Sequence, residues 1–234
     1  MQKSTAKIVN LNEAARASVA SAARISTQSG TALEIFARSG DAEKDLNLVR
    51  KVVASGHRSV TEHQTFTIAF NDVSVMVEQF MIEFRLASFT VKSRRYVDFS
   101  TAGFVIPAEI QDADAYCVQM ESLFGVYEKL MALGVPKEDA RFVLPYCLRS
   151  NFFVTVNARE LLHFAKLRTC TRAQWEIRHI ARQMVAMLAE ACPEVFARFG
   201  PSCAVSGKCP EGRMSCGHPV RIQDGIWKTR GKNE

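Results

Sequence analysis

Side chains suited to phosphate binding are concentrated in one short segment. The twelve residues from Arg85 to Tyr96 contain three arginines, two serines and a lysine. Arginine presents a planar fork of donors that matches a phosphate group, and serine hydroxyls can bind the oxygens that remain. This composition indicates a phosphate cradle, although the spacing alone also allows a solvated basic loop.

Three other side chains that could do chemistry each have two interpretations. His63, at the edge of a predicted strand, is either a site residue or a core histidine. Arg141 is either a ligand-binding residue or a surface residue of its helix. Arg168, near the carboxyl end of a predicted helix, either acts in a reaction or complements the helix dipole.

Three of the seven cysteines lie close together near the end of the chain. Cys203, Cys209 and Cys216, with His218, provide four soft or borderline ligands within sixteen residues. Such a set suits zinc or an iron–sulfur cluster, although the paired Cys-x-x-Cys spacing is missing. The alternative is a flexible tail with reduced thiols. The odd number and uneven placement of the cysteines argue against a secreted disulfide framework.

Length and composition limit the class of protein. The 234 residues, 47% of them hydrophobic and 23% charged, are typical of a soluble globular protein with one substantial core. The longest apolar runs stop well short of the ~18 residues that indicate a membrane span, and the first residues lack a secretory signal pattern. We therefore predict a cytoplasmic protein without membrane contact. The net charge of +6 predicts an anionic partner, either nucleic acid or a phosphorylated small molecule.

The elements that must position these side chains follow from hydrophobic periodicity and from capping residues. Helices are predicted over residues 13–26, 41–55, 74–87, 113–132, 137–147, 158–167 and 173–191, strands over 63–70 and 152–156, and a loop over 88–100. Asn157 is expected to cap the helix that follows it. The pattern predicts an α+β fold with mostly antiparallel strands. It also predicts one domain over 1–199 and a Cys-rich tail over 200–234 without helix or strand.

Several segments resemble, in order, those of one enzyme family. Residues 56–63 read Gly-His-x-Ser-x-x-Glu-His, Ala140-Arg141 precedes Leu144-Pro145, and residues 155–178 carry a further match. Between them, Arg85, Ser88, Ser93 and Arg95 stand at the last Arg of the opening triplet, the two serines and the closing Arg of the pattern Arg-His-Arg-x₂-Ser-x₄-Ser-x-Arg. Together these segments resemble the flavin-dependent thymidylate synthases over roughly residues 12–198.

The resemblance implies a fold, a reaction and an assembly. The implied fold is a single α+β domain with a central, mostly antiparallel sheet flanked by helices. The implied reaction is reductive methylation of dUMP to dTMP, with FAD as cofactor and with methylenetetrahydrofolate and NADPH as co-substrates. The implied assembly is a homotetramer whose active sites lie at subunit interfaces. Small-molecule substrates are expected, and nucleic acid is not.

The resemblance also implies roles for individual residues. Ser93, Arg95 and Arg141 are expected to bind the nucleotide phosphate. Arg168 is expected at the uracil ring, where a cation stabilises developing negative charge, and His63 is expected beside the flavin and folate, so both are the candidate catalytic residues. The remaining candidate flavin-binding residues are Arg85, Ser88, Asn157 and His163.

Two departures from the family pattern leave alternatives open. Glu83-Phe84 stands where the family has Arg-His, and Thr90-Val91 stands where Asn-Glu is usual. The first replaces a cation at a place used for flavin, and the second removes a carboxylate near the nucleotide. The alternatives are therefore a flavin-dependent methylase of another pyrimidine nucleotide, or a non-catalytic binder of nucleotide or nucleic acid.

Overall fold

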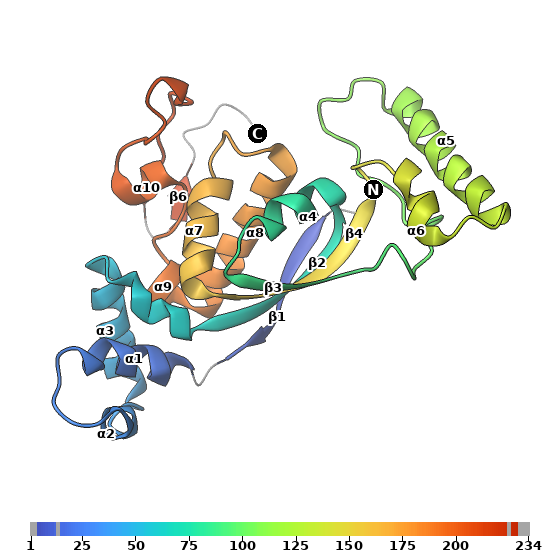
Figure 1. Ribbon diagram of the computed structural model, residues 1–234. Coiled ribbons are helices and arrows are strands. Elements are labelled where there is room, and N and C mark those ends of the chain that lie inside the picture. Colours follow the sequence, from blue (N-terminus) through green and yellow to red (C-terminus); the bar gives the residue numbers. More distant parts are fainter. Residues whose placement is uncertain (1–3, 13–14, 224–225, 229–234) are drawn as a thin grey trace. The chain divides into compact units, whose positions relative to one another are not determined.

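A four-stranded antiparallel sheet flanked by helices organises the protein, and the α+β prediction is confirmed (Figure 1). The computed structural model describes residues 4–12, 15–223 and 226–228. The strand order is β1-β2-β4-β3, and a separate two-stranded antiparallel sheet pairs β5 with β6. The strands are β1 (Thr5–Leu11), β2 (Thr65–Ser74), β3 (Ala87–Val91), β4 (Arg149–Asn157), β5 (Arg221–Gln223) and β6 (Ile226–Lys228).

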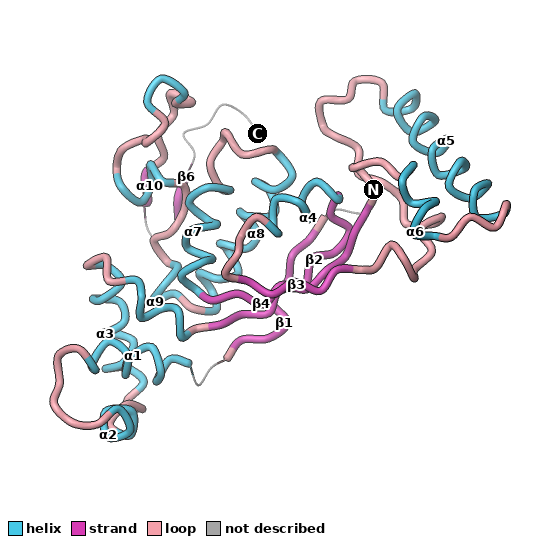
Figure 2. Tube along the Cα trace, in the orientation of Figure 1, coloured by secondary structure: helices cyan, strands magenta, loops and turns pink. Residues whose placement is uncertain are grey.

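Helices occupy most of the chain between the strands (Figure 2). The α-helices are α1 (Ala15–Ile25), α2 (Ala32–Ala37), α3 (Ala42–Ala54), α4 (Val75–Ile82), α5 (Ala113–Ala132), α6 (Lys137–Ala140), α7 (Ala158–Arg168), α8 (Trp175–Ala191), α9 (Pro193–Phe196) and α10 (Ser202–Ser206). The 3₁₀ helices are η1 (Arg58–His63), η2 (Arg141–Val143) and η3 (Gly212–Met214). Within the described residues, no helix is long and apolar enough to cross a membrane.

The described residues form two compact units. Unit 1 comprises residues 4–5, 69–83 and 89–153, and unit 2 comprises residues 6–12, 15–68, 84–88, 154–223 and 226–228. Each of the four long strands contributes residues to both units. Neither unit ends at residue 199, where the sequence predicts the boundary between the domain and the Cys-rich tail. That domain boundary stays a prediction.

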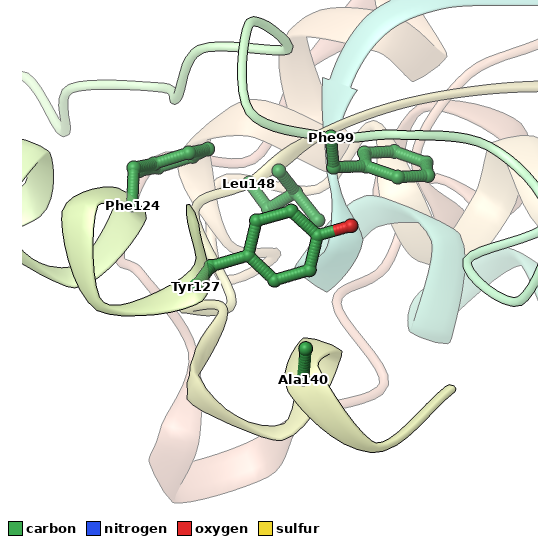
Figure 3. Packing of buried hydrophobic residues seen from close by; sticks show 5 residues of the cluster. All are labelled: Phe99, Phe124, Tyr127, Ala140 and Leu148. Carbon is green, nitrogen blue, oxygen red and sulfur yellow. The ribbon is translucent and has the colours of Figure 1, made fainter. Parts of the chain in front are cut away.

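Unit 1 has its own apolar core around α5. Phe99, Phe124, Tyr127, Ala140 and Leu148 are buried and lie around one another (Figure 3). Burying side chains of this size stabilises a fold by roughly 1.5–3 kcal/mol each. Because Ala140 belongs to this cluster, the core fixes the position of Arg141, the next residue in the chain.

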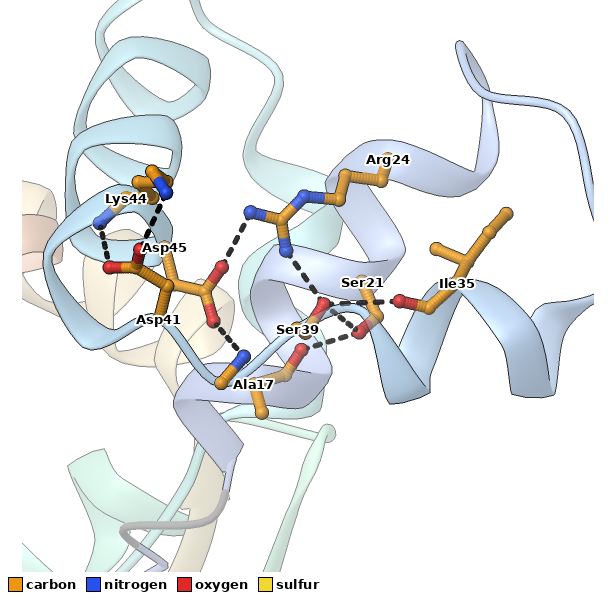
Figure 4. Close-up of polar contacts among 9 residues, drawn as sticks. Ala17, Ser21, Arg24, Ile35, Ser39, Asp41, Lys44 and Asp45 are labelled. Carbon is orange, nitrogen blue, oxygen red and sulfur yellow. Dashed lines mark hydrogen bonds and ion pairs between the residues drawn. The ribbon is translucent and has the colours of Figure 1, made fainter.

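In unit 2, a buried polar network joins α1, α2 and α3. Arg24 on α1 forms an ion pair of 2.5 Å with Asp45 on α3, and both side chains are largely buried. Arg24 also donates to Ser39 Oγ at 2.6 Å, and the Asp45 carboxylate accepts from Gly40 N at 2.9 Å (Figure 4). Ser39 Oγ also lies 3.3 Å from the Ile35 carbonyl of α2, so the network joins all three helices.

Most of the predicted helices are confirmed, with ends that depend on capping. The residues around α1, α3, α7 and α8 are helical as predicted, and α5 has the predicted bounds. Asp41 caps α3 through a bond from Lys44 N at 3.2 Å. Asn157 caps α7 through a bond from Glu160 N at 2.9 Å. The sequence pattern does not predict the β1 strand or the α2 helix.

The predicted loop over 88–100 is wrong in its first part, because β3 runs to Val91. As the last strand in the sheet order, β3 has only one neighbour, and none of its side chains is fully buried. Ala87, Phe89 and Val91 do alternate with Ser88 and Thr90, but the predicted helix over 74–87 ends inside this short pattern and separates its first residue from the rest.

Two predicted helices are too long. The predicted helix over 74–87 ends at Ile82, with Ser74 as its cap, and Ala87 already begins β3. The predicted helix over 137–147 ends in η2, and Leu144 is extended. Pro145 explains the second error, since a residue that precedes proline is disfavoured in the helical conformation.

The predicted strand over 63–70 and the predicted tail also need correction. His63 ends the 3₁₀ helix η1, and the strand begins only at Thr65. The segment after residue 200 contains α10, η3, β5 and β6, although the sequence pattern predicts neither helix nor strand there. Short elements rich in glycine, proline and cysteine lack the periodicity that sequence patterns detect.

Candidate active site

The three predicted phosphate-binding residues lie in unit 1. Ser93 is partly buried in the turn after β3 and accepts a bond from Arg95 N at 3.2 Å. Arg95 is exposed, and its Nε lies 2.6 Å from the Glu138 carboxylate. Arg141, where α6 passes into η2, donates from Nε to the Glu138 carbonyl at 2.9 Å. Two arginines from separate segments thus contact one glutamate, and both are accessible to a phosphate.

A pocket of about 240 Å³ lies beside Arg141 in unit 1. Its lining consists of Val75, Arg94, Arg141, Phe142, Leu144, Pro145, Tyr146 and Leu148. Two arginines among mainly apolar and aromatic side chains suit a ligand with a flat ring and an anionic group. Ser93 and Arg95 are not part of this lining.

The second arginine of this pocket, Arg94, is absent from the predicted site residues. Its guanidinium binds the Glu78 carboxylate through two bonds of 3.2 and 2.6 Å. Glu78 is 5% exposed and also accepts from Ser150 Oγ at 2.7 Å. A bidentate pair of this kind holds Arg94 in one orientation. The signal in the sequence is the single charged side chain of helix α4, whose other residues are apolar except Gln79.

The predicted flavin-binding and catalytic residues lie in unit 2. His63, His163, Arg85 and Ser88 are exposed, and Asn157 is partly buried at the start of α7. The exposure of His63 contradicts the alternative of a core histidine. Asn157 uses its carbonyl oxygen as the α7 cap and retains its amide nitrogen for a ligand. Arg168 is the last residue of α7 and is also partly buried.

Phe84 connects two of these residues. Its ring lies 5.8 Å from the His163 ring in an edge-on arrangement, and the Arg168 guanidinium carbon lies 5.6 Å from its centre. Both His163 and Arg168 belong to α7, whereas Phe84 belongs to the turn between α4 and β3. Within unit 2, long-range contacts therefore join Phe84 to two predicted site residues.

Unit 2 also contains a pocket of about 250 Å³ at the end of α7. Lys166, Arg168 and Arg172 line it together with segments 201–203 and 209–211 of the tail. Arg172 forms an ion pair with Glu211. Burial, and then the positive charge of Arg58, lower the pKa of Lys166. The pocket is therefore a cationic environment with one neutralising carboxylate, and the tail forms part of its wall.

The predicted metal ligands of the tail are near one another. Cys203, Cys209, Cys216 and His218, with Cys170, line a cavity of about 20 Å³. Within the described part of the chain, no three His, Cys, Asp or Glu side chains are placed to bind a metal ion. The Cys203 thiol is buried and accepts a bond from Val220 N at 3.5 Å. The described residues therefore give no support to the metal site, which stays a prediction.

The Cys216 thiol has a different environment. A hydrogen bond with the Thr171 side chain, followed by a bond with the His218 backbone, lowers its pKa. A lowered pKa favours the thiolate, which is the reactive form of cysteine. Cys216 lines the cavity of about 20 Å³, and its lowered pKa does not by itself make it a metal ligand.

Comparison with known proteins assigns most of this chain to one family. The chain matches the family described as "Thymidylate synthase complementing protein" over residues 7–194. It is 39% identical over 179 residues to the flavin-dependent thymidylate synthase of Geobacter sulfurreducens, covering 74% of this chain and 77% of that protein. It is 35% identical to the flavin-dependent thymidylate synthase of Thermococcus onnurineus, covering 97% of this chain and 94% of that protein.

A solved structure is similar as well. The UMP/dUMP methylase PolB from Streptomyces cacaoi, bound with 5-Br dUMP, is similar with a TM-score of 0.69 and 27% identity. The similarity covers 83% of this chain and 94% of that chain. Both the sequence matches and the structural match therefore cover most of the chain.

Proposed function

Since the chain belongs to the family of flavin-dependent thymidylate synthases, we propose that it methylates dUMP to dTMP with a bound flavin as redox cofactor. Membership makes the chain an enzyme, a methyltransferase, and the alternative of a non-catalytic binder is set aside. The finer assignments, namely FAD as the flavin and NADPH and methylenetetrahydrofolate as co-substrates, are part of the proposal.

The observation that supports this function best is the convergence of Arg95 and Arg141 on Glu138. These arginines come from segments on either side of α5, and the contacts place both beside one residue. In the proposed complex they bind the dUMP phosphate together with the Ser93 hydroxyl, and the phosphate competes with the Glu138 carboxylate for Arg95. Charge-assisted bonds from two arginines suit a dianionic phosphate.

Arg168 has a different proposed role from the phosphate-binding arginines. It is placed at the uracil ring, where it stabilises negative charge that develops on the ring during carbon transfer. Interactions that strengthen only in the transition state raise kcat, whereas a phosphate contact is equal in both states and lowers KM. The two groups of arginines therefore have separable kinetic signatures.

The donors of unit 2 fit a flavin dinucleotide. A diphosphate needs cations and hydroxyls, which Arg85 and Ser88 supply at accessible positions. The flavin ring needs donors and acceptors at its polar edge, which the Asn157 amide and the His163 and His63 imidazoles supply. When bound, the flavin supplies hydride chemistry that no side chain provides. The side chains hold the reactants in place and exclude competing orientations.

A second candidate substrate is UMP. The similar solved structure is that of a UMP/dUMP methylase, and Val91 stands where the family usually has a carboxylate near the nucleotide. Loss of that carboxylate removes a group that could discriminate between sugars by hydrogen bonding. We therefore keep UMP as an alternative substrate of the same site.

The test is a direct assay of the purified protein. It is incubated with FAD, NADPH, methylenetetrahydrofolate and either dUMP or UMP, and the methylated nucleotide is identified by mass. Formation of dTMP supports the proposal, and preferential methylation of UMP supports the alternative substrate. No methylated product from either nucleotide would contradict the proposal, and Arg168→Ala serves as the inactive control.

A further inference from the structure

Phe84 stands in a short connection whose other apolar residues are exposed. The connection runs from the end of α4 to the start of β3, and Ile82 and Leu86 on either side of Phe84 are 44% and 63% exposed. Phe84 itself is only 6% exposed. The chain thus buries this ring selectively, which indicates that its surroundings hold it in a defined position.

Phe84 makes ring contacts with residues of α7. Besides His163 and Arg168, the ring meets Phe164 at 5.1 Å between ring centres and an angle of 71°. Phe164 and Arg168 are four residues apart, so they lie on one face of the helix. One aromatic ring therefore covers the part of α7 that carries two predicted site residues.

The contact with Arg168 is attractive and directional. A guanidinium group over an aromatic face is attracted by the ring quadrupole and can stack flat on it. An arginine side chain has several rotatable bonds, and restricting them beforehand avoids that entropic cost during the reaction. A leucine or methionine in place of Phe84 would keep the apolar volume but would not have this electrostatic attraction.

From these contacts we propose that Phe84 is a positioning residue that holds the Arg168 guanidinium in its catalytic orientation. This inference rests on the proposed role of Arg168 at the uracil ring. Phe84 does not touch the substrate and acts through Arg168. The Phe84 and His163 rings meet edge-on, and this second contact also restricts the orientation of the imidazole. Phe84 stands where the family pattern has His, and we infer that this apolar ring orders the site-bearing face of α7.

The kinetic test compares ring-bearing and ring-free side chains. Phe84→Leu is expected to lower kcat by about tenfold, the effect of losing a largely desolvated cation–π contact. The KM for dUMP is expected to change less than about twofold, because the phosphate contacts remain. Phe84→Tyr keeps the aromatic face and is expected to retain kcat within about threefold of the parent. Phe84→Met provides a second ring-free variant if the leucine variant does not fold.

Phe196→Leu is the matched control. Phe196 is also buried in unit 2 and also makes an edge-on ring contact of 5.8 Å, with Phe66. It has no proposed role in the site, so its kcat is expected to stay close to the parent value. A kcat in Phe84→Leu that equals the parent, or that falls no further than in Phe196→Leu, would overturn the proposal. So would an equal loss in the tyrosine and leucine variants.

A second measurement does not depend on turnover. In protein labelled with ¹⁵N only at arginine, the Arg168 side-chain signal is assigned by its loss in Arg168→Lys. A ring-current shift of this signal is expected in the parent and in Phe84→Tyr and is expected to disappear in Phe84→Leu. An unchanged Arg168 signal in the leucine variant would contradict the contact. If the parent shows no methylation at all, the proposed function fails, and this measurement alone decides whether Phe84 orients Arg168.

Discussion

At the scale of single residues, Glu138 determines how accessible the proposed phosphate site is. Its carboxylate binds Arg95, while its carbonyl accepts from Arg141. Both partners of the Arg95 pair are about half exposed, and pairs of this kind contribute roughly 0–1 kcal/mol to stability. A phosphate dianion can therefore displace the carboxylate from Arg95 at little cost.

Arg95→Ala is expected to raise the KM for dUMP by about tenfold or more, because one charge-assisted bond of ~1.5–3 kcal/mol is lost. The kcat should change little, since the phosphate contact is the same in ground and transition states. Steady-state kinetics with varied dUMP measures both. Glu138→Gln is the control, because it keeps Arg95 and removes the competing carboxylate, so its KM should not rise. Equal dUMP affinity in the parent and Arg95→Ala would contradict the phosphate assignment.

Arg168→Ala is expected to lower kcat with the fold intact, because removal of a charged donor at the reacting ring costs ~2–4 kcal/mol of transition-state stabilisation. Circular dichroism checks the fold, and single-turnover assays measure the chemical step. Arg168→Lys keeps the charge without the planar fork and should be intermediate. An alanine variant with near-parent activity would remove Arg168 from the mechanism.

At the scale of elements, the helices α1 and α3 depend on the buried pair of Arg24 and Asp45. Asp45→Asn removes the negative charge and leaves the Arg24 cation without its ion pair in a largely buried place. We expect the free energy of unfolding to fall by about 3 kcal/mol, as when one partner of a buried pair is removed. Urea denaturation measures this change.

Asp41→Asn in the same segment is the control for the buried pair. Asp41 pairs with Lys44 at the surface and caps α3, and asparagine caps helices about as well as aspartate. Little change in stability is therefore expected. If Asp45→Asn and Asp41→Asn lowered the free energy of unfolding equally, burial of the Asp45 pair would not explain the loss of stability.

At the scale of the whole molecule, we propose a homotetramer whose active sites combine residues of several subunits. Light scattering on the eluting protein should then give a mass four times that of the 26.1 kDa chain. A monomeric mass would contradict the assembly.

Co-expression of two impaired variants, assayed at a dUMP concentration well below the KM of the phosphate-site variant, tests whether the sites are shared. Arg141→Ala carries its change in unit 1 and Arg168→Ala in unit 2. If one site takes these arginines from different subunits, mixed tetramers contain some sites with both arginines, and activity partly returns. Activity that stays at the level of the separate variants would show that both arginines come from one subunit.

The sequence alone determined the family, the α+β class and the positions of most helices. These features depend on local information: hydrophobic periodicity, capping by Asp41 and Asn157, and the order of short motifs from Gly56 to Arg178. Each can be recognised from neighbouring residues, because a helix and its caps are made of residues a few positions apart.

The tertiary structure alone determined which side chains meet. The five-residue strand β3 begins inside the predicted helix over 74–87, and its place at the edge of the sheet is set by pairing with another strand. Pro145 ends a helix that periodicity alone extends to residue 147. The contacts of Arg95 with Glu138, of Arg94 with Glu78, and of Phe84 with α7 join residues that are not neighbours in the chain. Such contacts depend on how elements pack, and packing is decided by the burial of whole faces rather than by any short pattern of residues.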